Sequence, residues 1–252
     1  MGTKTCSIYR GYRFPPAIIA RAVWLYHRFA LSLRDVEDLL AERGIEVSYE
    51  TIHQWCARFG RQFARRIKAR LGRRGDRWFL DEMVVSIGGR RRCLWRAVDQ
   101  DGDVLDILVQ KRKDTRSARR FFRKLLKGQG QLPMGITTDK LGSYVAAKRE
   151  VMASVPHCRE RYANNRAEVS HEHTRMRERQ MRGFRHAGYA QRFLSVFSQC
   201  HNLCRLGRHL LGARNYRLLR ARSFGTWATV TCAWRLGKGL AVSNRVGVSV
   251  PT

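Results

Sequence analysis

Along the first part of the chain, apolar residues recur with the spacing of amphipathic helices. The apolar positions within residues 17–29 repeat every three or four residues, directly after the Pro15-Pro16 pair, and predict a first helix. Ser32 and Asp35 stand at the spacing of a capping box and predict the start of a second helix. We expect the inward side of this second helix to consist of Leu33, Val36, Leu39 and Leu40.

A third helix is predicted to start at Ser48, beyond a turn at Gly44, with Ile52, Trp55, Cys56 and Phe59 inward. A helix, a short glycine-containing turn and a second helix form the helix-turn-helix arrangement. We therefore interpret residues 1–72 as an all-α DNA-binding domain that ends in a basic linker; an ordinary helical bundle is the alternative. The outward residues expected to meet base edges or phosphates are Thr51, His53, Gln54 and Arg58.

From Arg77 onward the apolar period changes from 3.6 to two, which indicates strands. Three strands joined by short glycine-containing turns come first, and the acidic run 99–103 is interpreted as a hairpin turn. A helix, a strand, a short helix, a possible strand and two further helices follow. The predicted ranges are 78–87, 93–99, 104–109, 115–127, 135–138, 143–150, 155–157, 167–181 and 190–211. This order is typical of a ribonuclease-H-like α/β catalytic domain, here residues 73–212, and leaves 213–252 as a basic tail of unknown structure.

The charge of the chain indicates a polyanionic partner. Fifty Lys and Arg against twenty Asp and Glu give a net charge of +30 over 252 residues. Because no apolar run approaches the roughly 18 residues that span a bilayer, DNA is expected rather than a membrane. The N-terminus has no signal-peptide pattern, so we expect a cytoplasmic protein that is associated with the nucleoid through its DNA.

The seven cysteines are scattered without paired CxxC spacing, which favours reduced thiols over a disulfide framework. Cys200 and Cys204 stand four residues apart on a predicted helix. Half of a zinc site is one interpretation of this pair. Two buried thiols on one helix face is the favoured interpretation, because no second ligand pair has suitable spacing.

Three acids stand out in this basic chain. Asp81 lies within an apolar strand pattern, Asp139 ends the strand 135–138, and Glu168 lies on a predicted helix. Two strand acids and one helix acid that converge would hold paired divalent cations for phosphoryl transfer. A core salt bridge is the alternative for Asp81, and a turn or helix cap is the alternative for Asp139. Glu82 is expected on the opposite strand face and is left out of the site.

Arg175 follows Glu168 by seven residues, which puts both on one face of the predicted helix. From this position its guanidinium can hold a phosphate or orient Glu168. A solvated arginine is the alternative.

Several stretches together resemble the DDE transposases of bacterial insertion sequences, in the group called insertion sequence family six. The matching stretches are Gly11–Pro16, Leu31–Glu37, Leu80–Glu82, Leu94–Asp99, Thr138–Lys140 with Ser143-Tyr144, and Asn164–Glu168 followed by Arg175–Arg179. The resemblance implies that Asp81, Asp139 and Glu168 form the catalytic triad with Arg175 as an accompanying basic residue. It also implies that the N-terminal module binds the terminal inverted repeats of the element. The connection between Asp139 and Glu168 is shorter than the family usually has.

We therefore expect a DNA transposase that cleaves strands at the ends of its element and transfers them into target DNA. Its expected cofactors are two Mg²⁺ or Mn²⁺ ions per active site, and its expected assembly is a homo-oligomer on DNA. A catalytically decayed copy that only binds DNA is one alternative. A ribonuclease-H-like nuclease is the other.

Overall fold

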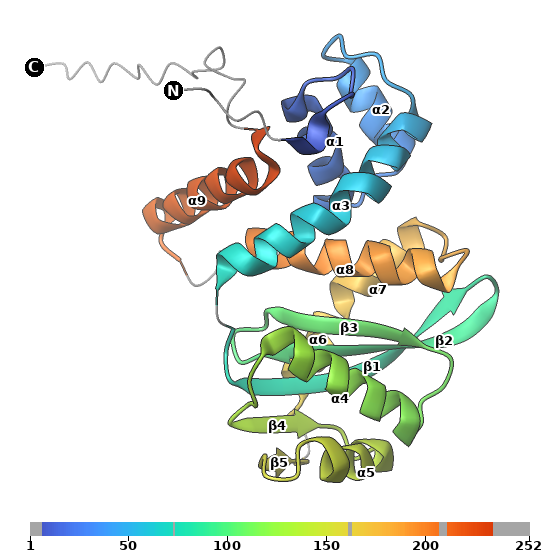
Figure 1. Cartoon of the computed structure of the whole chain (residues 1–252), viewed down its shortest axis with the longest axis vertical. Coiled ribbons are helices and arrows are strands. Elements are labelled where there is room, and N and C mark those ends of the chain that lie inside the picture. Colours follow the sequence, from blue (N-terminus) through green and yellow to red (C-terminus); the bar gives the residue numbers. More distant parts are fainter. Residues whose placement is uncertain (1–6, 73, 161–162, 207–210, 234–252) are drawn as a thin grey trace, which may run out of the picture.

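A five-stranded mixed sheet forms the centre of the computed structural model, which describes residues 7–72, 74–160, 163–206 and 211–233 (Figure 1). The strand order is β3-β2-β1-β4-β5. The strands are β1 (Arg77–Ile87), β2 (Arg90–Asp99), β3 (Val104–Gln110), β4 (Gly135–Thr138) and β5 (His157–Cys158). β1, β2 and β3 form an antiparallel meander, whereas β4 pairs in parallel with both β1 and β5. This topology confirms the predicted ribonuclease-H-like class.

Helices cover both faces of the sheet. On one face, α4 (Thr115–Gln129) and α5 (Gly142–Val151) pack over a core that includes Trp95, Phe121 and Tyr144. On the other face lie α6 (Asn165–Ser170), α7 (Glu172–Gln180) and α8 (Ala187–Cys204). The sheet is therefore the middle layer, and its two faces meet different sets of side chains.

The N-terminal helices lie on the outer side of α8, which α1 and α3 contact directly. They are η1 (Ser7–Tyr9), α1 (Pro16–Arg28), α2 (Leu33–Ala41) and α3 (Tyr49–Leu71). Ser32 and Asp35 form the predicted capping box, and the Ser48 side chain accepts a hydrogen bond from the backbone N–H of Thr51. Leu39, predicted to face inward, is instead 42% exposed, because it lies beside the buried stripe formed by Val36 and Leu40.

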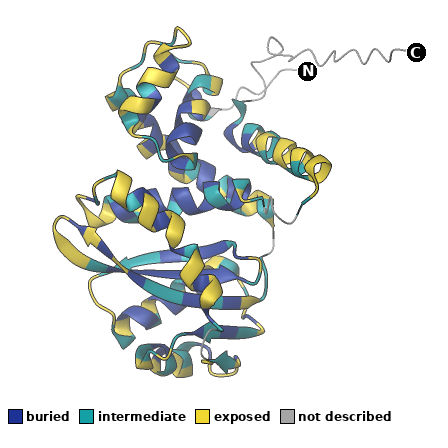
Figure 2. Cartoon of the chain, turned by 180° about the vertical axis from the view of Figure 1, so that it is seen from behind, coloured by how far each residue is buried: buried dark blue, intermediate teal, exposed yellow. Residues whose placement is uncertain are grey.

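The helical region and the sheet share one hydrophobic core. This core runs from the sheet face beneath α8, through α8 itself, to the inward sides of α1, α2 and α3. Figure 2 shows buried stretches of ribbon both in the sheet and in the helices above it. At the crossing of α3 and α8, a Cβ added to Gly60 would lie 3.3 Å from a methyl group of Val196, so the small residue permits close approach. The division at residue 72 remains a prediction.

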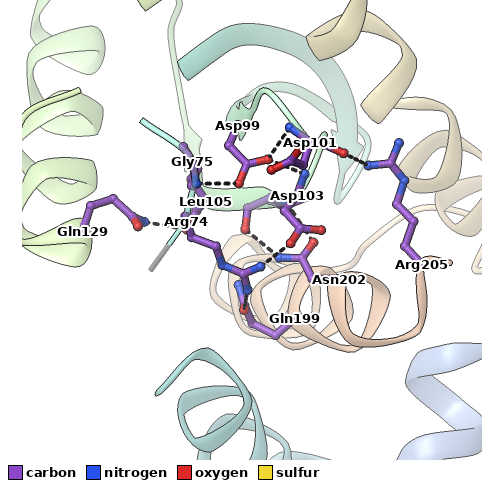
Figure 3. Close-up of polar contacts among 11 residues, drawn as sticks. Arg74, Gly75, Asp99, Asp101, Asp103, Leu105, Gln129, Gln199, Asn202 and Arg205 are labelled. Atoms are coloured by element: carbon purple, nitrogen blue, oxygen red, sulfur yellow. Dashed lines mark hydrogen bonds and ion pairs between the residues drawn. The ribbon is translucent and has the colours of Figure 1, made fainter. Parts of the chain in front are cut away.

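The segment between α3 and β1 is tied to the β2–β3 turn (Figure 3). Arg74 forms an ion pair with Asp103 and also donates to Gln199 of α8. The Asp99 carboxylate accepts hydrogen bonds from the backbone N–H groups of Gly75, Asp101 and Asp103, at 2.9–3.1 Å. The acidic run is thus a hairpin turn, as predicted, and it fixes the orientation of α3 relative to the sheet.

Some segments differ from their predicted form, and one is the helix expected over 190–211, which ends at Cys204 as α8. The helix expected over 167–181 is divided at His171, which ends α6 and precedes α7. The tail contains α9 (Ala213–Thr231), which packs against α3 through a ring contact between Trp227 and Phe63. Residues 234–252 lie outside the described residues. None of the described helices has both the length and the apolar composition needed to cross a membrane.

Among the described residues, the cysteines follow the expectation with one exception. Cys200 is buried and Cys204 is half-buried on the inner side of α8, and both are free thiols. Burial raises the pKa of the Cys200 thiol above its usual range. Cys232, at the end of α9, is disulfide-bonded, so the expectation of a reduced set is wrong there.

Candidate active site

Asp81 and Asp139 lie next to each other where two parallel strands separate. β4 pairs with β1 only as far as Thr138, which is opposite Leu80. Asp81 and Asp139 are the next residues on the two strands. β1 then continues along β2, and on its β4 side it has no backbone bridge among the described residues until Ile87 pairs with Phe184. The end of β4 therefore leaves a gap beside β1 into which both carboxylates can reach.

Three carboxylates gather at this gap. Ligand oxygens of Asp81, Glu82 and Asp139 all lie within 4.8 Å of one another. One oxygen of Asp139 accepts a hydrogen bond from the backbone N–H of Leu141 at 3.1 Å, so the turn role considered for Asp139 is real and still leaves its second oxygen. Glu82 was left out of the predicted site because strand alternation puts it on the opposite face, yet its carboxylate also reaches the edge where β4 ends.

Glu82 nevertheless faces the opposite side of the sheet from Asp81. Its Oε2 accepts a hydrogen bond from Tyr144 Oη of α5 at 2.6 Å, and its Oε1 forms an ion pair with Lys113. Burial raises the pKa of Glu82, and the bonds from Lys113 and Tyr144 oppose that rise. The Glu82 carboxylate is thus largely committed to partners within the protein.

Glu168 lies at the edge of the same site. It is exposed on α6 and lines a pocket of about 360 Å³ together with Asp139, Lys140, Arg159 and Asn164. Its carboxylate is not part of the group formed by Asp81, Glu82 and Asp139. The structure therefore brings the two predicted aspartates together and places Glu168 in a pocket beside Asp139.

Three buried side chains fasten α6 and the start of α7 over the strands. Asn164 Nδ2 donates to the Leu80 carbonyl at 2.8 Å, at the last residue of β1 that pairs with β4. The Arg96 guanidinium, on β2, donates to the Ser170 carbonyl and to the Thr174 hydroxyl. Burial lowers the pKa of Arg96 to about 10, so it stays charged at neutral pH. These bonds set the position of the helix that carries Glu168.

His171 provides the third attachment, at the break between α6 and α7. Its Nε2 lies 3.2 Å from Oδ2 of Asp81, and the ring is 2% exposed. Burial lowers the pKa of His171, whereas Asp81 acts in the opposite direction. From the sequence, no role was predicted for His171 or Arg96. The available signal for Arg96 was an arginine within a central strand.

Comparisons with known proteins agree with this arrangement. Residues 75–206, just over half of the chain, match the family DDE_Tnp_IS240, described as a DDE domain. The chain is 31% identical over 175 residues to the transposase for insertion sequence-like element IS431mec of Staphylococcus aureus, covering 68% of this chain and 78% of that protein. It has the same identity and coverage to the transposase for insertion sequence element IS257 in transposon Tn4003 of Staphylococcus aureus. This chain belongs to the DDE transposase family.

The predicted resemblance to insertion sequence family six is thereby confirmed. Among solved structures, the HTLV-2 integrase catalytic core domain in complex with magnesium has a TM-score of 0.40 and 14% identity. That likeness covers 54% of this chain and 88% of the integrase domain. The fold assignment of this DDE transposase rests on its strand order.

The donor set of the transposase site fits a divalent cation. Carboxylate oxygens are the hard ligands that Mg²⁺ and Mn²⁺ prefer, and those of Asp81, Glu82 and Asp139 lie close enough to share one. Asp81 and Asp139 each retain an oxygen without a hydrogen-bond partner among the described residues. The site is thus chemically suited to a bound metal.

The remaining predicted residues lie outside this carboxylate group. Arg175 is exposed on α7, and its side chain has no hydrogen-bond or ion-pair partner within the described residues. On α3, His53, Gln54 and Arg58 are exposed. The Thr51 hydroxyl lies 3.1 Å from the Ser48 hydroxyl, at the helix start, so it is partly used in capping.

Proposed function

We propose that this transposase binds the terminal inverted repeats of its insertion sequence and catalyses strand cleavage and strand transfer, with Asp81, Asp139 and Glu168 as the catalytic acids. The observation that carries the proposal is the placement of Asp81 and Asp139 just past the last paired residues of two parallel strands. The attachment of the Glu168 helix over that point supports the third acid.

The residues of the site fall into proposed metal ligands and residues that position those ligands. Asp81 and Asp139, with Glu168, would hold two Mg²⁺ or Mn²⁺ ions, which supply charge neutralisation for in-line displacement at phosphorus. His171 holds Asp81 in place, and Asn164 with Arg96 holds the helix of Glu168. Arg175, from α7, is proposed to contact a phosphate of the bound DNA.

Two displacements make up the reaction. In the first, a water oxygen bonds to a phosphorus at the element end and the bond from that phosphorus to the 3′ oxygen breaks, which leaves a 3′-hydroxyl and a 5′-phosphate. In the second, the 3′-hydroxyl bonds to a target phosphorus and displaces a target 3′-hydroxyl. Joining two ends requires that they meet, which favours a homo-oligomer on DNA.

Element ends would be recognised by α3. Gln54 and Arg58 lie on its exposed side, as expected for a helix that reads the major groove. Arg58 is proposed to contact phosphate, so Arg58→Ala should weaken binding to all DNA sequences alike. The salt slope, which is the steepness with which log affinity falls with log salt concentration, should decrease by about one unit.

A strand-transfer assay with the ends of the element tests the proposal. The wild-type protein should convert labelled end duplex and plasmid into joined product only with Mg²⁺ or Mn²⁺ present, and Asp81→Asn should bind the ends but make no product. Preferential end binding without product in any divalent metal would instead identify a DNA-binding protein. Cleavage without preference for the ends would identify a nuclease.

A further inference from the structure

A second site lies between α3 and the segment that joins α7 to α8, away from the acidic residues. It is a groove of about 890 Å³, and neither Asp nor Glu lines it. Its basic lining residues include Arg61 on α3, Arg185 before α8 and Arg192 on α8, and Tyr189 forms part of its wall. We propose that this groove binds the sugar–phosphate backbone of one DNA strand, next to the segment read by α3. The proposal rests on the function proposed above and extends it.

The three arginines are available for phosphate. Arg61, Arg185 and Arg192 are exposed, and their side chains have no hydrogen-bond or ion-pair partner within the described part of the chain. Phosphate contacts from Arg position DNA and do not depend on its sequence. Three guanidinium groups around one groove, with no carboxylate in its lining, are complementary in charge to the successive phosphates of a DNA strand.

A buried cation adds to the positive potential of the groove. Arg177, 1% exposed, lies behind the groove wall with its guanidinium carbon 4.9 Å from the ring centre of Tyr26 and 5.3 Å from that of Phe193. It donates to the Tyr26 carbonyl at 3.0 Å and forms no ion pair with any described carboxylate. A buried cation without an ion-pair partner among the described residues is screened little by solvent, so it favours an anion in the groove.

Aromatic side chains form the apolar part of the wall. Tyr26 and Tyr189 are joined through their hydroxyls at 2.8 Å, and Tyr189 stacks on Phe193 with ring centres 6.2 Å apart. Basic groups combined with aromatic surface are characteristic of grooves that follow a nucleic-acid strand. The close crossing of α3 and α8 at Gly60 holds the two walls at a fixed separation.

The groove divides the outer surface of α3 into two stripes. His53, Ala57 and Arg61 line the groove, whereas Gln54 and Arg58 lie outside it. The predicted recognition residues therefore separate. Gln54 and Arg58 face solvent outside the groove, whereas His53 faces Tyr189 across it, with ring centres 6.1 Å apart. One duplex can thus meet α3 through both stripes.

Salt-dependent binding by the full-length protein tests this site. Affinities for element-end duplex and for a random duplex would be measured across a salt series for wild type, Arg185→Ala, Arg192→Ala and the double variant. Arg123→Ala is the matched control, an exposed arginine on α4 across the sheet. Each groove variant should lower the salt slope by about one unit, and the double variant should weaken both duplexes by the same factor, about tenfold or more. Arg123→Ala should match wild type.

The outcomes separate this proposal from the proposed function. Slopes equal to those of Arg123→Ala overturn the groove as a DNA site even if the protein still joins ends. A change in oligomeric state with unchanged DNA slopes also overturns it and assigns the groove to a second copy. Loss of end preference in the wild type rejects the proposed function, while the random-duplex slopes still decide the groove. Thermal unfolding of each variant confirms that it is folded.

Discussion

Asp81 and Glu82 are consecutive residues on β1, yet their surroundings differ in kind. Asp81 faces α6 and α7, where its neighbour is the His171 ring at 3.2 Å. Glu82 faces α4 and α5, where Tyr144 donates to it at 2.6 Å and Lys113 pairs with it. Both reach the gap left by β4. The Asp81 carboxylate is held by His171 and keeps one oxygen without a hydrogen-bond partner among the described residues, whereas both oxygens of Glu82 are bonded to protein partners.

The difference shows that proximity alone does not assign a metal ligand. A carboxylate that already accepts a hydrogen bond and an ion pair loses these interactions when a cation displaces them. Glu168 has no such partner among the described residues and lines the pocket beside Asp139. We therefore propose that Glu82 supports the Asp139 side of the site and that Glu168 binds the metal.

The largest effect is expected at the strand ends. Asp139→Asn keeps the shape of the side chain and an acceptor for Leu141 but removes the charge. Strand transfer should fall by on the order of 10³-fold or more, since charge at a phosphoryl-transfer site is the main catalytic contribution. End binding should match wild type in a gel-shift assay. Substantial joining by this variant would remove Asp139 from the site.

Arg96→Met tests the attachment of the Glu168 helix. The substitution removes the donors to the Ser170 carbonyl and the Thr174 hydroxyl while keeping an unbranched side chain. Loss of such supporting bonds lowers activity by about 10–100-fold, and we expect that loss in single-turnover strand transfer with end binding unchanged. Full activity would show that α6 is positioned without Arg96.

His171→Asn tests whether the His171 ring orients the Asp81 carboxylate for metal binding. The ring contact with Asp81 Oδ2 is lost, so the carboxylate is less well oriented. The Mg²⁺ concentration that gives half-maximal joining should rise by about tenfold, whereas the rate at saturating Mg²⁺ should recover most of its wild-type value. A lower rate with an unchanged Mg²⁺ requirement would mean that His171 acts only on folding.

The α6–α8 side also contains histidines that burial keeps neutral. Burial lowers the pKa of His27 to about 4 and that of His201 to about 3. The unfolded chain titrates near 6.5, so between that pH and about 4 it binds more protons than the folded protein. The free energy of unfolding should therefore fall with falling pH, by roughly 1 kcal/mol per pH unit for each histidine.

Urea unfolding at pH 7.5 and pH 5 measures this loss. Replacing both residues in His27→Phe/His201→Phe, where each ring stacks on a neighbouring phenylalanine, should flatten the pH dependence. An equally steep loss in the double variant would place the titrating groups elsewhere.

Local patterns predicted most of the fold. The capping box at Ser32, the change of apolar period at Arg77 and the turn at Asp99–Asp103 each depend on neighbouring residues, and the structure has all three. The break at His171 was missed because a contact with Asp81, ninety residues earlier in the chain, defines it. Strand alternation predicted the face of Glu82 correctly, but not its closeness to Asp81 and Asp139, which depends on β4 ending at Thr138.

The most direct measurement of the central claim compares strand transfer by Glu168→Gln and Glu82→Gln, each normalised to its own end binding. Both substitutions remove one negative charge without a change in shape. We predict that Glu168→Gln lowers normalised strand transfer on the order of 10³-fold or more. Glu82→Gln, whose carboxylate is bonded to Lys113 and Tyr144, should lower it by only about 10- to 100-fold. An inactive Glu82→Gln beside an active Glu168→Gln would contradict the account and make Glu82 the third acid.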